Sequence, residues 1–165
     1  MPDIAYLSLG SNLGNREQNL TEAIQRLESI GAVRSVSSLY ETEPVEFNDQ
    51  PEFLNCAVGI ETTALPEELM RQLLEIEQAM GRKRVQKKGP RLIDLDILLF
   101  GDRIVNTPEL TIPHPAMHQR RFVLEPLAEI TPAARHPVLK KTTKEMLREL
   151  PPGQAVRRIG SISLG

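Results

Sequence analysis

The chain of 165 residues has no tryptophan, one cysteine, two tyrosines and four phenylalanines. Its single cysteine, Cys56, excludes a disulfide within the chain and fits a reducing compartment. The longest purely apolar run, residues 97–100, is far too short to cross a bilayer. Residues 1–10 have neither the basic start nor the apolar stretch of a signal peptide. We therefore expect a cytoplasmic protein that does not associate with membranes.

Several common binding motifs are also missing. The chain has neither a G-x-x-x-x-G-K-[ST] nor a G-x-G-x-x-G sequence, and no Cys/His set has zinc spacing. Residues 10–14, Gly-Ser-Asn-Leu-Gly, fit neither glycine pattern, so we interpret them as a structural turn. A net charge of −2 gives no polycationic character, so an anion site must come from a local cluster. The length, with no repeat or linker, predicts one domain over residues 1–165, and we expect a monomer.

Hydrophobic periodicity predicts the secondary structure. We expect a strand over residues 4–9, a helix that begins after Asn15 and stops at Gly31, and a helix that Pro66 opens and Gly81 ends. Proline-rich residues 107–137 should form loop and short helix. The remaining predicted elements are strands at 33–40, 53–61, 91–100 and 155–159 and a helix at 143–150. This order predicts an α+β fold, a ferredoxin-like α/β sandwich with a mostly antiparallel sheet. Helices should pack on one face and leave the other free for a site.

Two aspartates share one face of the strand predicted at 91–100. Side chains alternate along a strand, so Asp94 and Asp96 point the same way, about 7 Å apart. Two like charges repel unless something positive lies between them, and Mg²⁺ prefers such oxygen ligands. Taken alone, the pair is equally compatible with a solvated strand face. The opposite face of this strand should carry its aliphatic residues, Ile93, Leu95, Ile97 and Leu99.

A cluster of six cations within ten residues precedes the aspartates. A basic loop that leads into a carboxylate pair is typical of a site for a triphosphate and its metals. A solvated basic loop remains an alternative. A nucleic-acid patch is disfavoured because the cluster has no aromatic residue for stacking and the whole chain is slightly acidic. The cations are Arg82, Lys83, Arg84, Lys87, Lys88 and Arg91.

The strand predicted at 53–61 adds an aromatic ring and an amide. Phe53 and Asn55 share the face opposite the apolar one, where a flat heterocycle could stack on the ring and bond to the amide. A phenylalanine that fills a loop contact is the alternative for Phe53 alone. The apolar face of this strand carries Leu54, Cys56, Val58 and Ile60.

These residues lie in motifs that resemble the 6-hydroxymethyl-7,8-dihydropterin pyrophosphokinases of folate biosynthesis. The resemblance covers about residues 5–128, and its most specific part is Gly-Pro-Arg at 89–91 followed by Asp-Leu-Asp-Ile at 94–97. The chain departs from some family members at Lys88, where they carry tryptophan, and at Glu109, where they carry arginine. The other matching segments are residues 9–14, 40–44, 50–55, 110–115 and 120–123.

The resemblance implies a role for each matched residue. Asp94 and Asp96 would hold two Mg²⁺ ions and, with Arg82 and Arg91, would be the catalytic residues. Glu77 would be an acid of the active centre. The ATP-binding residues would be Arg82, Arg84, Arg91, Ile97 through its backbone, Thr111, His114 and Arg120. The pterin-binding residues would be Thr42, Pro44, Val45, Phe53, Asn55 and Phe122.

The reaction that the resemblance implies is transfer of the β,γ-diphosphate of ATP to the pterin hydroxymethyl group, with AMP as the second product. The substrates would be ATP and 6-hydroxymethyl-7,8-dihydropterin, with no nucleic acid. One alternative is a non-enzymatic ligand-binding module on the same fold, which leaves the paired aspartates and cations unexplained. Another is an RNA-binding module, which needs aromatics on adjacent central strands, where only Phe53 qualifies.

Overall fold

The computed structural model describes residues 3–42, 52–81, 92–153 and 155–162. Within these ranges the main sheet has six strands in the order β5–β1–β4–β3–β8, with β2 beside β4, and every pair is antiparallel. A separate two-stranded sheet joins β6 (Val105–Asn106) to β7 (Thr111–Ile112). The main strands are β1 (Asp3–Ser11), β2 (Ala32–Val36), β3 (Leu39–Thr42), β4 (Phe53–Thr62), β5 (Asp94–Phe100) and β8 (Val156–Gly160).

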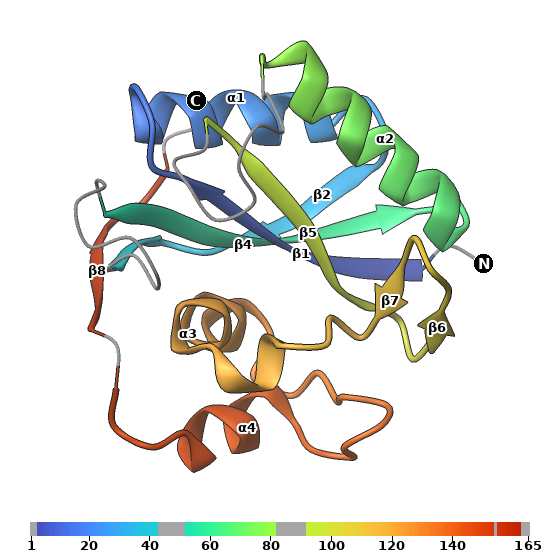
Figure 1. Cartoon of the computed structure of the whole chain (residues 1–165), viewed down its shortest axis with the longest axis vertical. Helices are drawn as coiled ribbons and strands as arrows, with labels where there is room; N and C mark the ends of the chain where they lie inside the picture. Colours follow the sequence, from blue (N-terminus) through green and yellow to red (C-terminus); the bar gives the residue numbers. More distant parts are fainter. Residues whose placement is uncertain (1–2, 43–51, 82–91, 154, 163–165) are drawn as a thin grey trace.

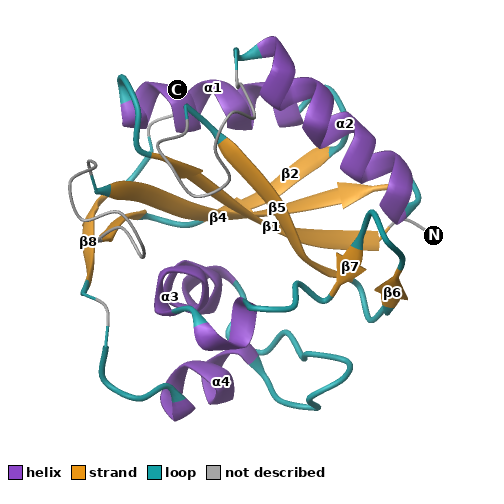
Figure 2. Ribbon diagram, in the orientation of Figure 1, coloured by secondary structure: helices purple, strands orange, loops and turns teal. Residues whose placement is uncertain are grey.

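Helices lie on both sides of this sheet (Figures 1 and 2). α1 (Arg16–Leu27) and α2 (Pro66–Ala79) cover one face. α3 (Arg121–Ile130) lies on the other face, and α4 (Thr143–Glu149) packs against α3. A short 3₁₀ helix, η1 (Met117–Gln119), precedes α3. No helix within the described ranges is long and apolar enough to span a membrane.

The sandwich fold predicted from the sequence is confirmed, and the structure adds a layer. α1 and α2 lie together on one face as expected, and Asn15 caps α1 by accepting a hydrogen bond from the Gln18 N–H. α3 is a ten-residue helix within the stretch expected to be loop and short helix. It covers part of the face that we expected to be free, because Val123, Leu124 and Leu127 bury against the sheet and α4.

The main core lies between the sheet and the α1/α2 layer. It takes the predicted apolar face of β4, and Leu20, Ala23, Ile24 and Leu27 of α1 are fully buried in it. The smaller core beneath α3 contains Ala57 from the opposite face of β4. Alternation along β4 therefore separates the two cores as expected from strand geometry. The predicted strand at 33–40 is in fact two strands, β2 and β3, which pair with successive parts of β4.

A β-bulge changes one side-chain assignment on β5. Leu7 of β1 pairs with Ile97, but the next pair is Tyr6 with Leu99, so Leu98 is an extra residue. We expected Leu99 on the same face as Ile97, and that was wrong because the extra residue reverses the alternation. Leu99 instead joins Leu98 in the core beneath α3, and Phe100 returns to the main core. The bulge lies after Asp96, so the two aspartates keep their shared face.

Glu129 of α3 fastens this helix to β3. Its carboxylate accepts hydrogen bonds from the Tyr40 hydroxyl at 2.6 Å, from the Ser38 N–H at 3.1 Å and from the Ser38 hydroxyl at 3.0 Å. Burial acts to raise the pKa of Glu129, but these hydrogen bonds outweigh it and hold the pKa below its ordinary value. The stabilisation is therefore present above about pH 4.5 and is lost as the pH falls through the lowered pKa.

We predict that Tyr40→Phe lowers the free energy of unfolding at pH 7 by about 1 to 2 kcal/mol, since a hydrogen bond to a charged group is removed. The loss should shrink toward pH 3, as the pH falls through the lowered pKa of Glu129. Urea denaturation at both pH values measures it. Tyr6→Phe is the control, because among the described residues no hydrogen bond to that hydroxyl is recorded, and it should change the free energy little at either pH. A Tyr40→Phe loss that is the same at pH 3 and pH 7 would contradict the ionic account.

Candidate functional site

Strand pairing places an aspartate and an amide in one row across the sheet. Gly10 of β1 pairs with Asp94 of β5 on one side and with Asn55 of β4 on the other. Neighbouring strands lie about 4.8 Å apart, so Asp94 and Asn55 are about 10 Å apart at the backbone. The next row on this face holds Asp96, Ser8 and Ala57. Asp94, Asp96 and Asn55 therefore share one face of the sheet.

Gly10 lies in the middle of this row, although the sequence indicated only a structural turn. A Cβ atom there would lie 2.9 Å from Asn55 Oδ1 and 3.7 Å from Phe53 Cδ1. The missing side chain thus lets the amide and the aromatic ring lie over β1, between β4 and β5. A glycine inside a strand is a signal for this kind of close approach, and it was available in the sequence.

The predicted pterin-binding residues that the structure describes on β3 and β4 lie together. Asn55 is buried, and its Nδ2 donates a hydrogen bond to Thr42 Oγ1 at 2.9 Å. Thr42 pairs with Phe53 in the ladder between β3 and β4, and Phe53 is partly exposed. The Thr42 hydroxyl therefore fixes the orientation of the Asn55 amide. Pro44 and Val45 lie outside the described residues.

Asp94 and Asp96 are partly exposed on the face opposite the main core, while Leu95 and Ile97 are buried in that core. Two half-buried carboxylates suit Mg²⁺, which binds through one or two carboxylates and completes its shell with water and substrate phosphates. Within the described residues no set of three or more His, Cys, Asp or Glu side chains converges on a common point. Arg82, Arg84 and Arg91 lie outside the described residues.

Glu77 reaches the same strand from the opposite side of the sheet. It lies on α2 with 2% of its surface exposed, and its Oε2 accepts a hydrogen bond from the Leu95 N–H at 2.8 Å. This bond fixes the backbone between Asp94 and Asp96. The sequence did not reveal this contact, because helical spacing does not show which strand edge faces a helix. The structure therefore gives Glu77 a contact behind the aspartates rather than on their face.

His114 borders Asp94 and is held by backbone contacts. The backbone N–H of His114 donates a hydrogen bond to the Leu98 backbone oxygen at 3.0 Å. The imidazole Nδ1 accepts a hydrogen bond from the Ala116 backbone N–H at 3.2 Å. Burial lowers the pKa of His114, and Arg120 lowers it further, whereas Asp94 acts to raise it. The imidazole is therefore neutral at pH 7, and the bond to Nδ1 leaves the proton on Nε2. Nε2–H can then donate to an anion without adding a charge.

The other predicted contacts are spread around this face. The Arg120 guanidinium lies 5.6 Å from the centre of the Phe122 ring, at the start of α3. The Ile97 side chain is buried in the main core, so only its backbone is available to a nucleotide. Thr111 is exposed on β7, three residues before His114. The structure thus brings Phe122 and Arg120 together at the start of α3.

The fold and this face define a class: an α+β sandwich in which an acidic pair shares one side of an antiparallel sheet with a phenylalanine and a buried amide. Comparison with known families then identifies the chain. The family model described as 7,8-dihydro-6-hydroxymethylpterin-pyrophosphokinase (HPPK) matches residues 6–132. The chain belongs to this family.

Two bacterial relatives match most of their own length. The 2-amino-4-hydroxy-6-hydroxymethyldihydropteridine pyrophosphokinase of Bacillus subtilis is 50% identical over 132 residues, which is 79% of this chain and 79% of that protein. The enzyme of the same name from Aquifex aeolicus is 40% identical over 144 residues, 87% of this chain and 90% of that protein. These relatives support the family assignment over most of the chain.

Longer relatives contain a similar segment. The folic acid synthesis protein FOL1 of Dictyostelium discoideum is 41% identical over 157 residues, 95% of this chain but 24% of that protein. The chain thus spans about a quarter of the length of this relative, and 22% of the similar protein of Schizosaccharomyces pombe. The solved Plasmodium falciparum HPPK-DHPS with pteroate has a TM-score of 0.74 at 18% identity, over 90% of this chain and 42% of that chain. At that identity the likeness shows the fold alone.

We predict that Gly10→Ala lowers the affinity for a pterin at least tenfold. The new methyl group would need the Asn55 amide or the strand to move, since 2.9 Å is too short for a real contact. Fluorescence titration with 6-hydroxymethylpterin measures the affinity. Gly153→Ala is the matched control, because its nearest contact would be the Pro151 oxygen at 3.9 Å. Equal affinity of the Gly10→Ala variant and the wild-type chain would show that this strip of β1 is not the floor of the pocket.

Proposed function

We propose that this chain transfers the β,γ-diphosphate of ATP to the hydroxymethyl group of 6-hydroxymethyl-7,8-dihydropterin, giving AMP and the pterin diphosphate, as a step of folate biosynthesis. Membership of the family supports the reaction class. The observation that carries the proposal is the row Asp94–Gly10–Asn55, which puts a partly exposed carboxylate about 10 Å from a buried amide on one face of the sheet. That separation suits a bicyclic ring beside Asn55 whose substituent points toward phosphates beside Asp94.

The pterin would bind where the structure has Thr42, Phe53 and Asn55. The Asn55 amide, oriented by Thr42, presents a donor and an acceptor to the edge of the heterocycle. The partly exposed Phe53 ring offers one stacking face, and Phe122 at the start of α3 would supply the second. Pro44 and Val45 are proposed to complete this pocket. Such a pocket orients the hydroxymethyl oxygen toward the aspartate row, and orientation of two substrates lowers the entropic part of the barrier.

The triphosphate would lie along β5. Asp94 and Asp96 would hold two Mg²⁺ ions, which when bound neutralise charge on the transferring group. The Nε2–H of His114 would donate a hydrogen bond to a phosphate oxygen, and Arg120 would add a positive charge beside it. The phosphates are proposed to be bound by Arg82, Arg84 and Arg91, and Arg82 and Arg91 are also proposed to act in catalysis. The nucleotide is proposed to contact Thr111 and the Ile97 backbone. Glu77 keeps the backbone between the two carboxylates in place.

The transfer needs one bond made and one broken. The pterin hydroxymethyl oxygen attacks the β-phosphorus of ATP, the bond from that phosphorus to the α-phosphate oxygen breaks, and AMP leaves with that oxygen. The hydroxyl proton passes to solvent. All the residues proposed here come from one chain, so the reaction requires no second copy, and we propose a monomer. The single buried cysteine is compatible with a cytoplasmic location.

We predict that Mg²⁺, ATP and the pterin together yield AMP and no stoichiometric ADP, as measured by chromatography of the nucleotides. Asp94→Ala and Asp96→Ala should each lower the rate at least about a hundredfold, because charge on the transferring group is no longer neutralised. Both variants should keep the wild-type fold, since both side chains are partly exposed on the face opposite the main core.

Asp102→Asn is the control for that experiment, because Asp102 is an exposed aspartate in the turn after β5. It should retain the wild-type rate. Stoichiometric ADP would mean transfer of a single phosphoryl group and would refute the proposed reaction. A chain that binds both ligands but releases no AMP would instead be a non-enzymatic binding module.

A further inference from the structure

Four charged residues form a closed ring behind the pocket proposed for the pterin. Arg16 Nη2 lies 2.8 Å from Glu41 Oε2, and Arg16 Nη1 donates to the Glu52 backbone oxygen at 2.8 Å. Arg157 Nη2 lies 2.6 Å from Glu41 Oε1 and 3.1 Å from Glu52 Oε2. Each arginine therefore contacts both residue 41 and residue 52. We refer to Arg16, Glu41, Glu52 and Arg157 as the arginine ring.

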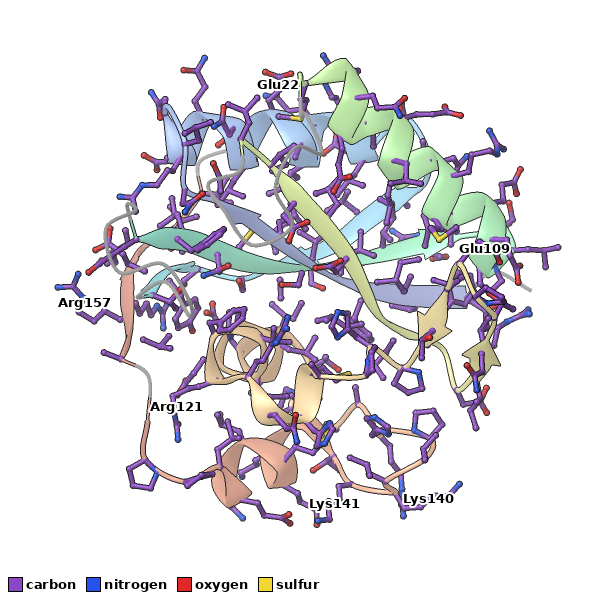
Figure 3. All side chains as sticks on the ribbon, in the orientation of Figure 1. Glu22, Glu109, Arg121, Lys140, Lys141 and Arg157 are labelled. Atoms are coloured by element: carbon purple, nitrogen blue, oxygen red, sulfur yellow. The ribbon has the colours of Figure 1, made fainter. Side chains whose placement is uncertain are left out.

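The ring joins elements that are far apart in the sequence. Arg16 is the first residue of α1, Glu41 lies in β3, and Arg157 lies opposite Glu41 in the edge strand β8. Figure 3 labels Arg157, which lies beside β8 at the edge of the sheet opposite β5. The C-terminal strand thus contributes to a structure formed by the first helix and by the strands that carry the pocket.

The residues of the ring are direct neighbours of two pocket residues. Glu41 precedes Thr42, Glu52 precedes Phe53, and Thr42 pairs with Phe53 at the end of the ladder between β3 and β4. Side chains alternate along strands, so Glu41 points to the face opposite Thr42. The ring consequently fixes the backbone of the pocket from behind. Its side chains lie on the opposite face of the sheet and cannot contact a ligand beside Thr42 and Phe53.

The contacts of the arginine ring matter because the ladder between β3 and β4 that they support is short. β3 pairs with β4 through three residues, Tyr40, Glu41 and Thr42, and ladder ends open more readily than ladder centres. Isolated surface ion pairs contribute little, but here the Glu41 side chain is only 17% exposed and two arginines share it. Arg16 foremost holds the pKa of Glu41 below its usual range, which keeps the carboxylate charged at neutral pH.

We propose that the arginine ring is a positioning device for the pterin pocket, in which Arg157 of the C-terminal strand holds Thr42 and Phe53 at the spacing that the heterocycle requires. The proposal rests on the proposed function, because it takes Thr42 and Phe53 as pterin contacts. Its consequence is selective: the ring lies beside β3 and the start of β4, whereas Asp94, Asp96 and His114 lie at the opposite edge of the sheet. Loss of the ring should therefore affect pterin binding and leave ATP binding unchanged.

The test compares Arg157→Ala with Arg34→Ala. Arg34 is a matched control, since it too is an exposed arginine that joins strands of this sheet, through Glu61, with 60% of its side chain exposed against 63% for Arg157. Dissociation constants for pterin and for Mg²⁺-ATP are measured separately by titration, together with KM, kcat and the unfolding midpoint. Arg157→Ala should raise the pterin dissociation constant and KM about five- to tenfold and leave the ATP constant and kcat within twofold.

Arg157→Lys should recover part of the pterin affinity, because an ammonium can still lie between two carboxylates. Arg34→Ala should leave both dissociation constants within twofold of the wild-type values, even if its unfolding midpoint falls as far as that of Arg157→Ala. Equal losses for ATP and pterin, a loss in Arg34→Ala as large as in Arg157→Ala, or unchanged pterin binding in Arg157→Ala would each overturn the proposal. The wild-type chain separates the two hypotheses: if it binds pterin but forms no AMP, the proposed reaction fails while the binding comparison still tests the ring.

Discussion

The pairing of β1 with both β4 and β5 is the constraint on which the site depends. Because β1 lies between these strands, its register decides which residue of β5 faces which residue of β4. Gly10 falls between Asp94 and Asn55, and the absence of a side chain there leaves room for the Asn55 amide and the Phe53 ring over β1. A shift of one residue in either pairing would turn the aspartates or the amide into the main core.

The two layers of helices support that register from opposite sides. α1 and α2 bury the apolar faces of β1, β4 and β5, and Glu77 binds the edge of β5 between the aspartates. α3 covers only part of the other face, where Glu129 fastens it to β3. The aspartates and Phe53 remain partly exposed beside it. The site is therefore a section of sheet that the second helical layer leaves uncovered.

The sequence predicted the features that depend on local periodicity, such as which side chains share a face of a strand. It did not predict the features that depend on pairing between residues far apart in the chain. Alternation placed Asp94 with Asp96 and Phe53 with Asn55, and each pair does share a face. It misplaced Leu99, since a bulge depends on the partner strand. The contact of Glu77 with Leu95 and the ring that joins Arg157 to Glu41 cross 18 and 116 residues of sequence, and no spacing rule reveals such contacts. The length of α3 was underestimated, because the prolines between residues 107 and 137, Pro126 among them, suggested loop and only short helix.

The central claim is that metal and pterin bind on one face, about 10 Å apart across Gly10. Paramagnetic relaxation measures this distance directly, with Mn²⁺ in place of Mg²⁺, a non-hydrolysable ATP analogue and bound 6-hydroxymethylpterin. The account predicts strong broadening of the hydroxymethyl protons, and Asp94→Asn with Asp96→Asn should abolish it. Bound pterin whose proton resonances stay sharp when Mn²⁺ and the analogue are also bound would contradict the shared face.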